Sequence, residues 1–263
     1  MPPKVSIITR VYNNKQITKE CIESIKRNTI NIDYEHIIID NGSTDDTSGY
    51  LQNLSDIILI KNPKNYGCAI SLNQGVSKSC GKYICNVDND VIVSKNWLLP
   101  MVEFAEKNKN IGIVSPGTRE GDFNYDMDKY AEDFTKRMKN VKDDGFGGWC
   151  MLIKKEVIDK IGLFSEEFNM YCEDTDFYYR MESAGFKAIT IGSSFVHHRV
   201  NATLSKIPGK KIFEQEHILK LRKKWNINED VYFKRKAKSF LKFIKNSYYK
   251  ILNGHTLLEK AKK

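Results

Sequence analysis

Apolar residues occur along the chain in two alternating patterns. Short, nearly continuous apolar runs are typical of strands buried on both faces, and longer segments with apolar residues every three or four positions are typical of helices. Segment 15–27, for example, places Ile17, Cys21, Ile22 and Ile25 on one helical face. The pattern predicts strands at residues 5–12, 34–40, 56–62, 83–87 and 111–116, and helices at 15–27, 65–81 and 96–107.

Strands that alternate with helices favour an α/β fold with a mostly parallel central sheet and right-handed crossovers. After the second strand, the stretch "NGSTDDT" offers Ser43 or Thr44 as the cap of a further helix, with Asp45 and Asp46 in its first turn. In such sheets ligands bind beyond the carboxyl ends of the strands. We therefore expect the functional site at that edge.

Residues 116–145 follow neither pattern and are polar, with acidic patches. This segment predicts either a loop or a short helix over the site. Regular patterns return with a strand at 147–153 and a helix at 154–164. A helix at about 174–184, ended by Gly185, and a last strand before His197 complete this part of the chain.

The composition is that of a soluble globular protein, with 41% hydrophobic and 29% charged residues among 263. No apolar run approaches the roughly 20 residues that span a bilayer, and the N-terminus lacks the apolar core of a secretory signal. The six cysteines form no CxxC pair and no zinc spacing, which favours buried free thiols in a reducing compartment. These features predict a cytoplasmic protein.

The net charge of +9 is concentrated near the C-terminus, where residues 209–263 hold 16 Lys and Arg against five Asp and Glu. Residues 1–208 therefore sum to −2, which argues against nucleic-acid binding by the body. Residues 231–252 place apolar side chains on one helical face, with lysines elsewhere. Such a basic helix either contacts the anionic inner face of the cell membrane or packs on its own domain or a second subunit. The apolar face consists of Phe233, Ala237, Phe240, Ile244, Tyr248 and Ile251.

Two carboxylates interrupt the apolar run "YICNVDNDVIVS". Buried unpaired charge is costly, so Asp88 and Asp90 must meet a cation or lie at an exposed strand end. Strand alternation would point both in one direction and Asn89 in the other. Two carboxylates at a strand end suit Mg²⁺ or Mn²⁺, which would in turn hold a phosphate. A solvated turn explains the motif equally well, and we interpret the second such motif, at Asp126 and Asp128, as surface.

Further acids stand at the ends of other predicted elements. Asp40 ends a strand, where it can accept a hydrogen bond from a nucleobase or belong to an Asx-turn. Glu173, Asp174 and Asp176 begin a helix, where acids usually stabilise the helix dipole. Alternatively, one of these three is a general base for an incoming hydroxyl.

Two histidines, His197 and His198, follow the last predicted strand. A single histidine is more often structural than a ligand. One of this pair could nevertheless complete the shell of a metal ion.

Together these pieces resemble an inverting nucleotide-sugar glycosyltransferase of family 2, with the glycosyltransferase-A (GT-A) fold. Seven stretches occur in the family's order over residues 5–199, and the later ones are most similar to a rhamnosyltransferase-like branch whose members build bacterial surface polysaccharides. The stretches are "VSIITRVYNN", "IIIDNGSTDDT", "NPKNYGCAISLNQGV", "VDNDVIV", "GGWCMLIKKEVIDKIGLFSEEF", "YCEDTDFYYRMESAGFK" and "FVHH".

The resemblance implies how a nucleotide-sugar donor would be bound. Asp40 would bind a uracil or thymine base, Asp88 would contact the ribose or the metal's water shell, and the start of the chain would line the nucleotide pocket. The donor-binding residues implied are Thr9, Val11, Tyr12, Asp40, Asn65, Gly67, Asn73, Asp88 and Asn89.

The resemblance also implies a metal ion, Mn²⁺ or Mg²⁺, that bridges the donor diphosphate. Asp90 and Asp88 would hold it together with His197, although the adjacent His198 leaves the register open by one.

The remaining roles belong to catalysis and to the sugars. Asp174 matches the family's catalytic base, with Glu173 beside it. Gly148 and Trp149 lie where the donor and acceptor sugars meet.

The implied organisation is a GT-A catalytic domain at residues 1–208 and a basic helical tail at 209–263. The nucleotide-binding half would cover about 1–116 and the acceptor-binding half about 117–208. The chain has no QxxRW stretch, which favours a single addition over processive synthesis. Residues 116–145 match nothing general in the family, so acceptor specificity is expected there.

The expected function is metal-dependent transfer of one sugar from a UDP- or dTDP-sugar to a hydroxyl of a glycan or lipid-linked acceptor. An alternative is a non-catalytic relative that binds sugar nucleotides or acts as a scaffold. Nucleotidyltransferases and dinucleotide-binding proteins are disfavoured because "RVYNN" after the first strand lacks their glycine-rich loops.

Overall fold

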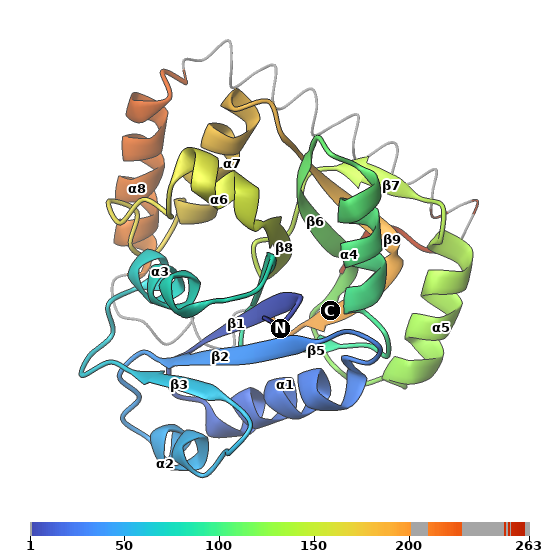
Figure 1. Ribbon diagram of the computed structural model, residues 1–263, viewed down its shortest axis with the longest axis horizontal. Coiled ribbons are helices and arrows are strands. Elements are labelled where there is room, and N and C mark those ends of the chain that lie inside the picture. The colour runs from blue at the N-terminus through green and yellow to red at the C-terminus, as the bar shows by residue number, and fades with distance from the viewer. Residues whose placement is uncertain (1, 201–209, 228–249, 251, 253, 261–263) are drawn as a thin grey trace.

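The computed structural model describes residues 2–200, 210–227, 250, 252 and 254–260. The first part is a parallel α/β unit, as the alternating pattern predicts, with each strand followed by a helix or turn that returns the chain to the same edge (Figure 1). Its elements are β1 (Val5–Val11), α1 (Lys15–Asn28), β2 (Tyr34–Asp40), α2 (Thr47–Gln52), β3 (Ile58–Lys61), α3 (Cys68–Lys78) and β4 (Tyr83–Val87).

The second part extends the same sheet but mixes strand directions. Its elements are β5 (Val91–Val93), α4 (Leu98–Lys107), β6 (Ile111–Glu120), α5 (Met127–Met138), β7 (Lys142–Asp144), β8 (Cys150–Lys154), α6 (Lys155–Ile161), α7 (Glu173–Ser183), β9 (Lys187–His198), α8 (Lys210–Lys224) and β10 (Leu258–Lys260). Within the described residues the strand order is β3-β2-β1-β4-β8-β6-β9-β5, with β10 beside β6 and β7 beside β9. β8 runs antiparallel between β4 and β6, so the sheet is mostly rather than wholly parallel.

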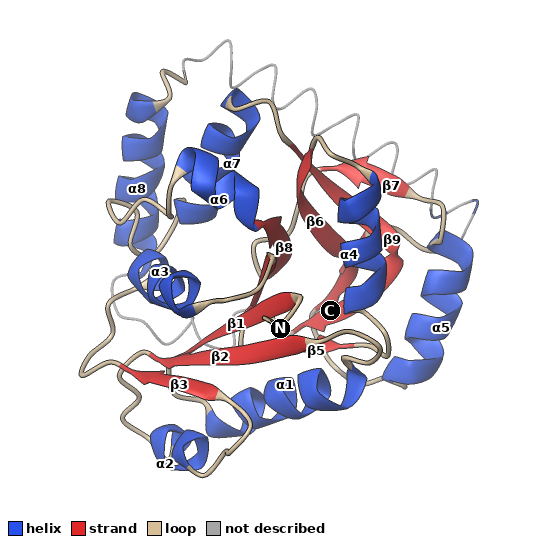
Figure 2. Cartoon of the chain, in the orientation of Figure 1, coloured by secondary structure: helices blue, strands red, loops and turns tan. Residues whose placement is uncertain are grey.

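Helices cover both faces of this sheet (Figure 2). On one face α1 and α4 bury apolar residues against β1, β4 and β6, and Trp97 is fully buried there. On the other face α3, α6 and α7 pack against β1, β2 and β8. Two covered faces explain why the strands are continuous apolar runs rather than alternating ones.

Two local predictions differ from the structure. Helix α2 begins at Thr47, after Asp46, and so the predicted cap at Ser43 or Thr44 is wrong. Both residues instead bond the turn after β1, where the Asn13 amide donates to Ser43 Oγ and the Thr44 amide donates to Asn13 Oδ1. All six cysteines are free thiols, as predicted, but only Cys21, Cys85 and Cys150 are buried. Cys68 and Cys172 are partly exposed and Cys80 is exposed.

The C-terminal part of the chain returns to the body at two places. Lys224 and Trp225, at the end of α8, contact the buried Asp176 carboxylate of α7. Strand β10 pairs in parallel with the end of β6. The helix predicted at 231–252 lies outside the described residues, apart from positions 250 and 252. In the part of the chain that is described, no helix is long and apolar enough to cross a membrane.

Candidate functional site

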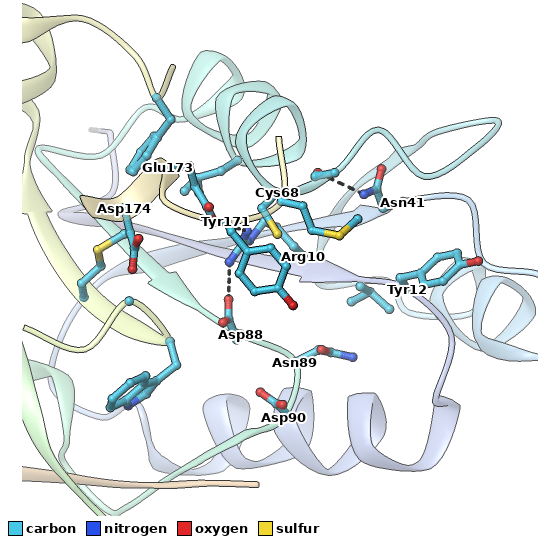
Figure 3. Close-up of a pocket in the computed structure, with 18 of the residues that line it drawn as sticks. Arg10, Tyr12, Asn41, Cys68, Asp88, Asn89, Asp90, Tyr171, Glu173 and Asp174 are labelled. Atoms are coloured by element: carbon cyan, nitrogen blue, oxygen red, sulfur yellow. Dashed lines mark hydrogen bonds and ion pairs between the residues drawn. The ribbon is translucent and has the colours of Figure 1, made fainter. Parts of the chain in front are cut away.

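A pocket of about 320 Å³ opens beyond the carboxyl ends of β1 and β4. Its walls come from the loops after β1, β2 and β4, the start of α3, the turn before β8 and the start of α7 (Figure 3). This is the edge at which parallel α/β sheets bind their ligands. Segments far apart in the sequence therefore converge on one crevice.

Most of the predicted site residues line this pocket. They are Val11, Tyr12, Asn65, Gly67, Asp88, Asn89, Asp90, Gly148, Trp149, Glu173 and Asp174. The four that do not line it are Thr9, Asp40, Asn73 and His197.

Three of those four are held in hydrogen bonds away from the pocket. Thr9 Oγ1 lies 2.9 Å from Nε2 of His36 on the neighbouring strand β2, and both side chains are buried. Asp40 is buried and accepts a 2.9 Å hydrogen bond from the Ser43 amide. Asn73 donates to the Phe164 carbonyl and accepts from the Phe164 amide, so it fastens α3 to the loop after α6.

The two histidines point to opposite faces of β9. His197 is buried, with Nδ1 3.0 Å from the Tyr125 hydroxyl and Nε2 3.1 Å from the Gly121 carbonyl, and burial lowers its pKa to about 4. His198 lines the pocket. The structure thus brings the alternative residue, His198, rather than His197 to the site, because adjacent strand residues alternate in direction.

His198 lies between two carboxylates. Its Nε2 is 3.4 Å from Asp90 Oδ1, and its Nδ1 is 3.5 Å from Glu120 Oε1. Burial opposes the charged ring, but the adjacent carboxylates of Asp90 and Glu120 outweigh burial and raise the pKa of His198 to about 9. The two carboxylates therefore favour the protonated ring.

Residues 88–90 form a turn between β4 and β5 rather than a strand, and the Val91 amide donates to the Asp88 carbonyl. Strand alternation therefore does not apply, and the prediction that Asp88 and Asp90 point together is wrong. Asp88 turns toward β1 and Asp90 toward β9.

Arg10 is the main residue that the sequence analysis missed. Its Nη2 lies 2.5 Å from Asp88 Oδ1, and its Nη1 lies 3.7 Å from Glu173 Oε1. The only signal in the sequence is an arginine inside the apolar strand "VSIITRVY". A charge at such a position must be paired, which predicts an acidic partner without naming it.

Glu173 and Asp174 begin α7 and face the pocket. Burial and the neighbouring Asp174 raise the pKa of Glu173 to about 7, and burial also raises the pKa of Asp174. The Thr175 amide donates a 2.6 Å hydrogen bond to Asp174 Oδ1, which favours the ionised form. A Cβ on Gly148 would lie 2.5 Å from Asp174 Oδ2, so any larger residue at 148 would displace the Asp174 carboxylate.

Trp149 lines the same pocket. Its indole stacks on His198, with ring centroids 4.9 Å apart, and its Nε1 donates to Thr118 Oγ1. No residue of 116–145 lines the pocket. The short helix predicted in that segment exists as α5, but its placement over the site is wrong, because Ala131, Phe134 and Met138 pack against Phe195.

The pocket also offers ligands for a divalent cation. In the described ranges, no three His, Cys, Asp or Glu side chains group into a complete metal site. Asp90 and His198 are adjacent, however, and Asp88 lines the same pocket. Carboxylate and imidazole ligands suit Mn²⁺, and such ions complete their shells with water and substrate phosphates. The donor set therefore fits a cation that is shared with an anionic ligand.

Residues 6–162, more than half of the chain, match the family model described as glycosyl transferase family 2. An uncharacterized glycosyltransferase of Haemophilus influenzae is 39% identical over 116 residues, which are 41% of this chain and 35% of that protein. The uncharacterized glycosyltransferase EpsJ of Bacillus subtilis is 26% identical over 236 residues, covering 84% of this chain and 68% of EpsJ. The match to the H. influenzae relative thus spans about a third of that protein.

Two solved structures share the fold. A mannosyltransferase from Pyrobaculum calidifontis, in complex with GDP-Man and Mn²⁺, superposes with a TM-score of 0.59 at 20% identity, over 77% of this chain and 59% of that one. S. aureus TarS 1-349 superposes with a TM-score of 0.58 at 15% identity, over 74% of this chain and 60% of that one. At such identities the likeness concerns the fold, which is of the GT-A type. The match to the family model over residues 6–162 shows that the chain belongs to glycosyl transferase family 2.

Proposed function

We propose that this protein is a metal-dependent inverting glycosyltransferase that moves one sugar from a UDP- or dTDP-sugar to an acceptor hydroxyl. The observation that carries the proposal is the convergence of Asp88, Asp90 and Asp174 on one pocket, although they are distant in the sequence. Solvated turn and cap residues would have no reason to meet in this way.

The nucleoside would occupy the end of the pocket formed by Val11, Tyr12 and Asn65. Asp40 lies directly before the pocket-lining Asn41. To recognise a base, it would exchange its present hydrogen bond with the Ser43 amide for one from the base.

Asp90 and His198, with Asp88 beside them, would hold the cation. When bound there, Mn²⁺ or Mg²⁺ would act as a Lewis acid that offsets the charge on the diphosphate. His198 would have to lose its proton to become a ligand, because only a neutral imidazole can ligate a metal.

The chemistry assigned to the chain's own residues is a proton transfer with a single displacement. Asp174 takes the proton from the acceptor hydroxyl, and that oxygen bonds to the anomeric carbon as the bond to the diphosphate oxygen breaks. Such general-base catalysis contributes about 10²–10⁴-fold. Base and leaving group lie on opposite faces of the sugar, so the configuration inverts.

Glu173 supports this assignment through its protonation state. Burial and the neighbouring Asp174 raise the pKa of Glu173. Asp174 is the member of the pair that accepts two hydrogen bonds from Thr175, and these favour its ionised form.

We further propose that the acceptor is a glycan or a lipid-linked glycan of bacterial surface polysaccharide or glycoconjugate synthesis. This follows the resemblance to the rhamnosyltransferase-like branch, and the absence of a QxxRW stretch favours one addition per acceptor. The net +11 of residues 209–263 would suit contact with an anionic membrane that carries such an acceptor.

Donor hydrolysis tests the proposal without knowledge of the acceptor. The purified chain is incubated with UDP-, dTDP- and GDP-sugars in Mn²⁺ or in EDTA, and release of nucleoside diphosphate is measured. We expect slow release from at least one sugar in Mn²⁺ and little in EDTA. Binding of a sugar nucleotide without any release would instead favour the non-catalytic alternative.

A further inference from the structure

We propose that Arg10 binds the phosphate oxygens of the donor's nucleoside diphosphate, through N–H groups that have no hydrogen-bond acceptor among the described residues. This inference rests on the proposed function. It assigns binding of the departing diphosphate to Arg10, which is not one of the proposed metal ligands. It also predicts that part of the affinity for the donor is independent of the metal.

The position of Arg10 matches the diphosphate rather than the base or the acceptor. Arg10 directly precedes Val11 and Tyr12, which line the proposed nucleoside end of the pocket. Figure 3 shows the guanidinium between Tyr12 on one side and Asp174 on the other. In a bound nucleotide sugar, the diphosphate is the group between the nucleoside and the carbon that is attacked.

The guanidinium has unused hydrogen-bond donors. Nη2 is bonded to Asp88, but Nε and Nη1 are buried and have no hydrogen-bond partner among the described residues. A guanidinium carries five N–H groups in a fixed fork that fits two phosphate oxygens at once. A buried donor without a partner is unfavourable, and an acceptor from a ligand would remove that cost.

Tyr171 provides a second donor in the same pocket. Its hydroxyl is buried and likewise has no hydrogen-bond partner among the described residues. Figure 3 shows its ring in the middle of the pocket. The Tyr171 hydroxyl can donate as well as accept, so a ligand that accepts hydrogen bonds, as a diphosphate does, would satisfy both Arg10 and Tyr171.

Acidic side chains outnumber basic ones in the pocket, so a bound diphosphate needs a cationic group beside it. Of the described residues that line it, Asp88, Asp90, Glu173 and Asp174 are acidic, and only Arg10 and His198 are basic. His198 is already engaged by Asp90 and Glu120. Arg10 is also paired with carboxylates, but two of its nitrogens, Nε and Nη1, lack hydrogen-bond acceptors among the described residues, so it can bind an anion that enters next to these acids.

The test compares a nucleoside diphosphate with its own nucleoside by calorimetric titration in EDTA. UDP, dTDP and GDP are titrated into the full-length chain, and the tightest binder is paired with uridine, thymidine or guanosine. We expect Arg10→Met to weaken the affinity for the diphosphate about ten-fold or more, because a charge-assisted hydrogen bond is lost. The affinity for the nucleoside should be unchanged. Arg10→Lys keeps the charge but not the forked arrangement of N–H groups. Its affinity for the diphosphate should lie between those of the wild type and Arg10→Met.

Arg137→Met is the matched control. Arg137 pairs with Asp133 on α5, outside the pocket, so the same chemical change there should leave both titrations at their wild-type values. Melting curves of each variant confirm that it is folded.

Three results would overturn the assignment of Arg10. One is equal affinity of wild type and Arg10→Met for the diphosphate. Another is a parallel loss of diphosphate and nucleoside, which would make Arg10 a structural clamp for Asp88 and Glu173. The third is wild-type binding that disappears entirely in EDTA. If the wild type binds none of the three diphosphates even with Mn²⁺, the proposed function itself is wrong.

Discussion

Asp174→Asn is expected to lower sugar transfer by about 10²–10⁴-fold while leaving donor affinity nearly unchanged. The amide keeps the shape of the side chain and can accept from the Thr175 amide, which now donates to Asp174 Oδ1 at 2.6 Å. It cannot take a proton from the acceptor hydroxyl. Turnover is measured as product formed per enzyme, and affinity as the calorimetric Kd of the donor with Mn²⁺.

Asp128→Asn serves as the control, since Asp128 is exposed on α5 and does not line the pocket. It should match the wild type in both assays. Undiminished turnover of Asp174→Asn would remove Asp174 from the role of base. A large loss of donor affinity together with turnover would mean that the carboxylate holds the donor instead.

Asp90→Ala is expected to abolish the gain in donor affinity that Mn²⁺ provides. Asp90 is buried at the pocket wall beside His198, and its loss removes the ligand that is central to the proposed cation site. With a charge-assisted contact worth about 1.5–3 kcal/mol, the affinity in Mn²⁺ should fall roughly ten-fold or more. Calorimetric titrations of the donor in Mn²⁺ and in EDTA measure the difference.

In EDTA, the donor affinity of Asp90→Ala should equal that of the wild type. Arg10→Met should behave in the opposite way, because it is expected to lose affinity in EDTA. Asp128→Ala, in the other D-x-D motif, should retain the full effect of Mn²⁺, because it lies outside the pocket. If Asp90→Ala responds to Mn²⁺ as the wild type does, the cation is held elsewhere.

Local patterns predicted most elements of the first half of the fold, although the short strand β5 was not among them. The strands β1, β2 and β4 agree within one residue because each is a continuous apolar run between polar turns. The insertion of antiparallel β8 between β4 and β6 had no local signal, since it depends on which strands pair. The start of α2 was misjudged because Ser43 and Thr44 bond the distant Asn13 turn rather than their own helix.

The candidate site was predictable where short motifs carry their own chemistry, as Asp88, Asp90, Asp174 and Trp149 do. What the sequence could not show is which side chains meet. Arg10 finds its partner Asp88 at a separation of 78 residues, and a strand pattern contains no information about that pair. The choice between His197 and His198 likewise depends on which face of β9 meets the pocket.

In the proposed mechanism, Asp174 and the departing diphosphate act on opposite faces of one anomeric carbon. The most direct measurement is the configuration of the sugar first released when a hydrolysable donor is incubated with the chain and Mn²⁺, followed by proton NMR before the anomers equilibrate. A single displacement predicts a product opposite in configuration to the donor. A product that retains the donor's configuration would require a covalent intermediate or a different mechanism, and would contradict the account.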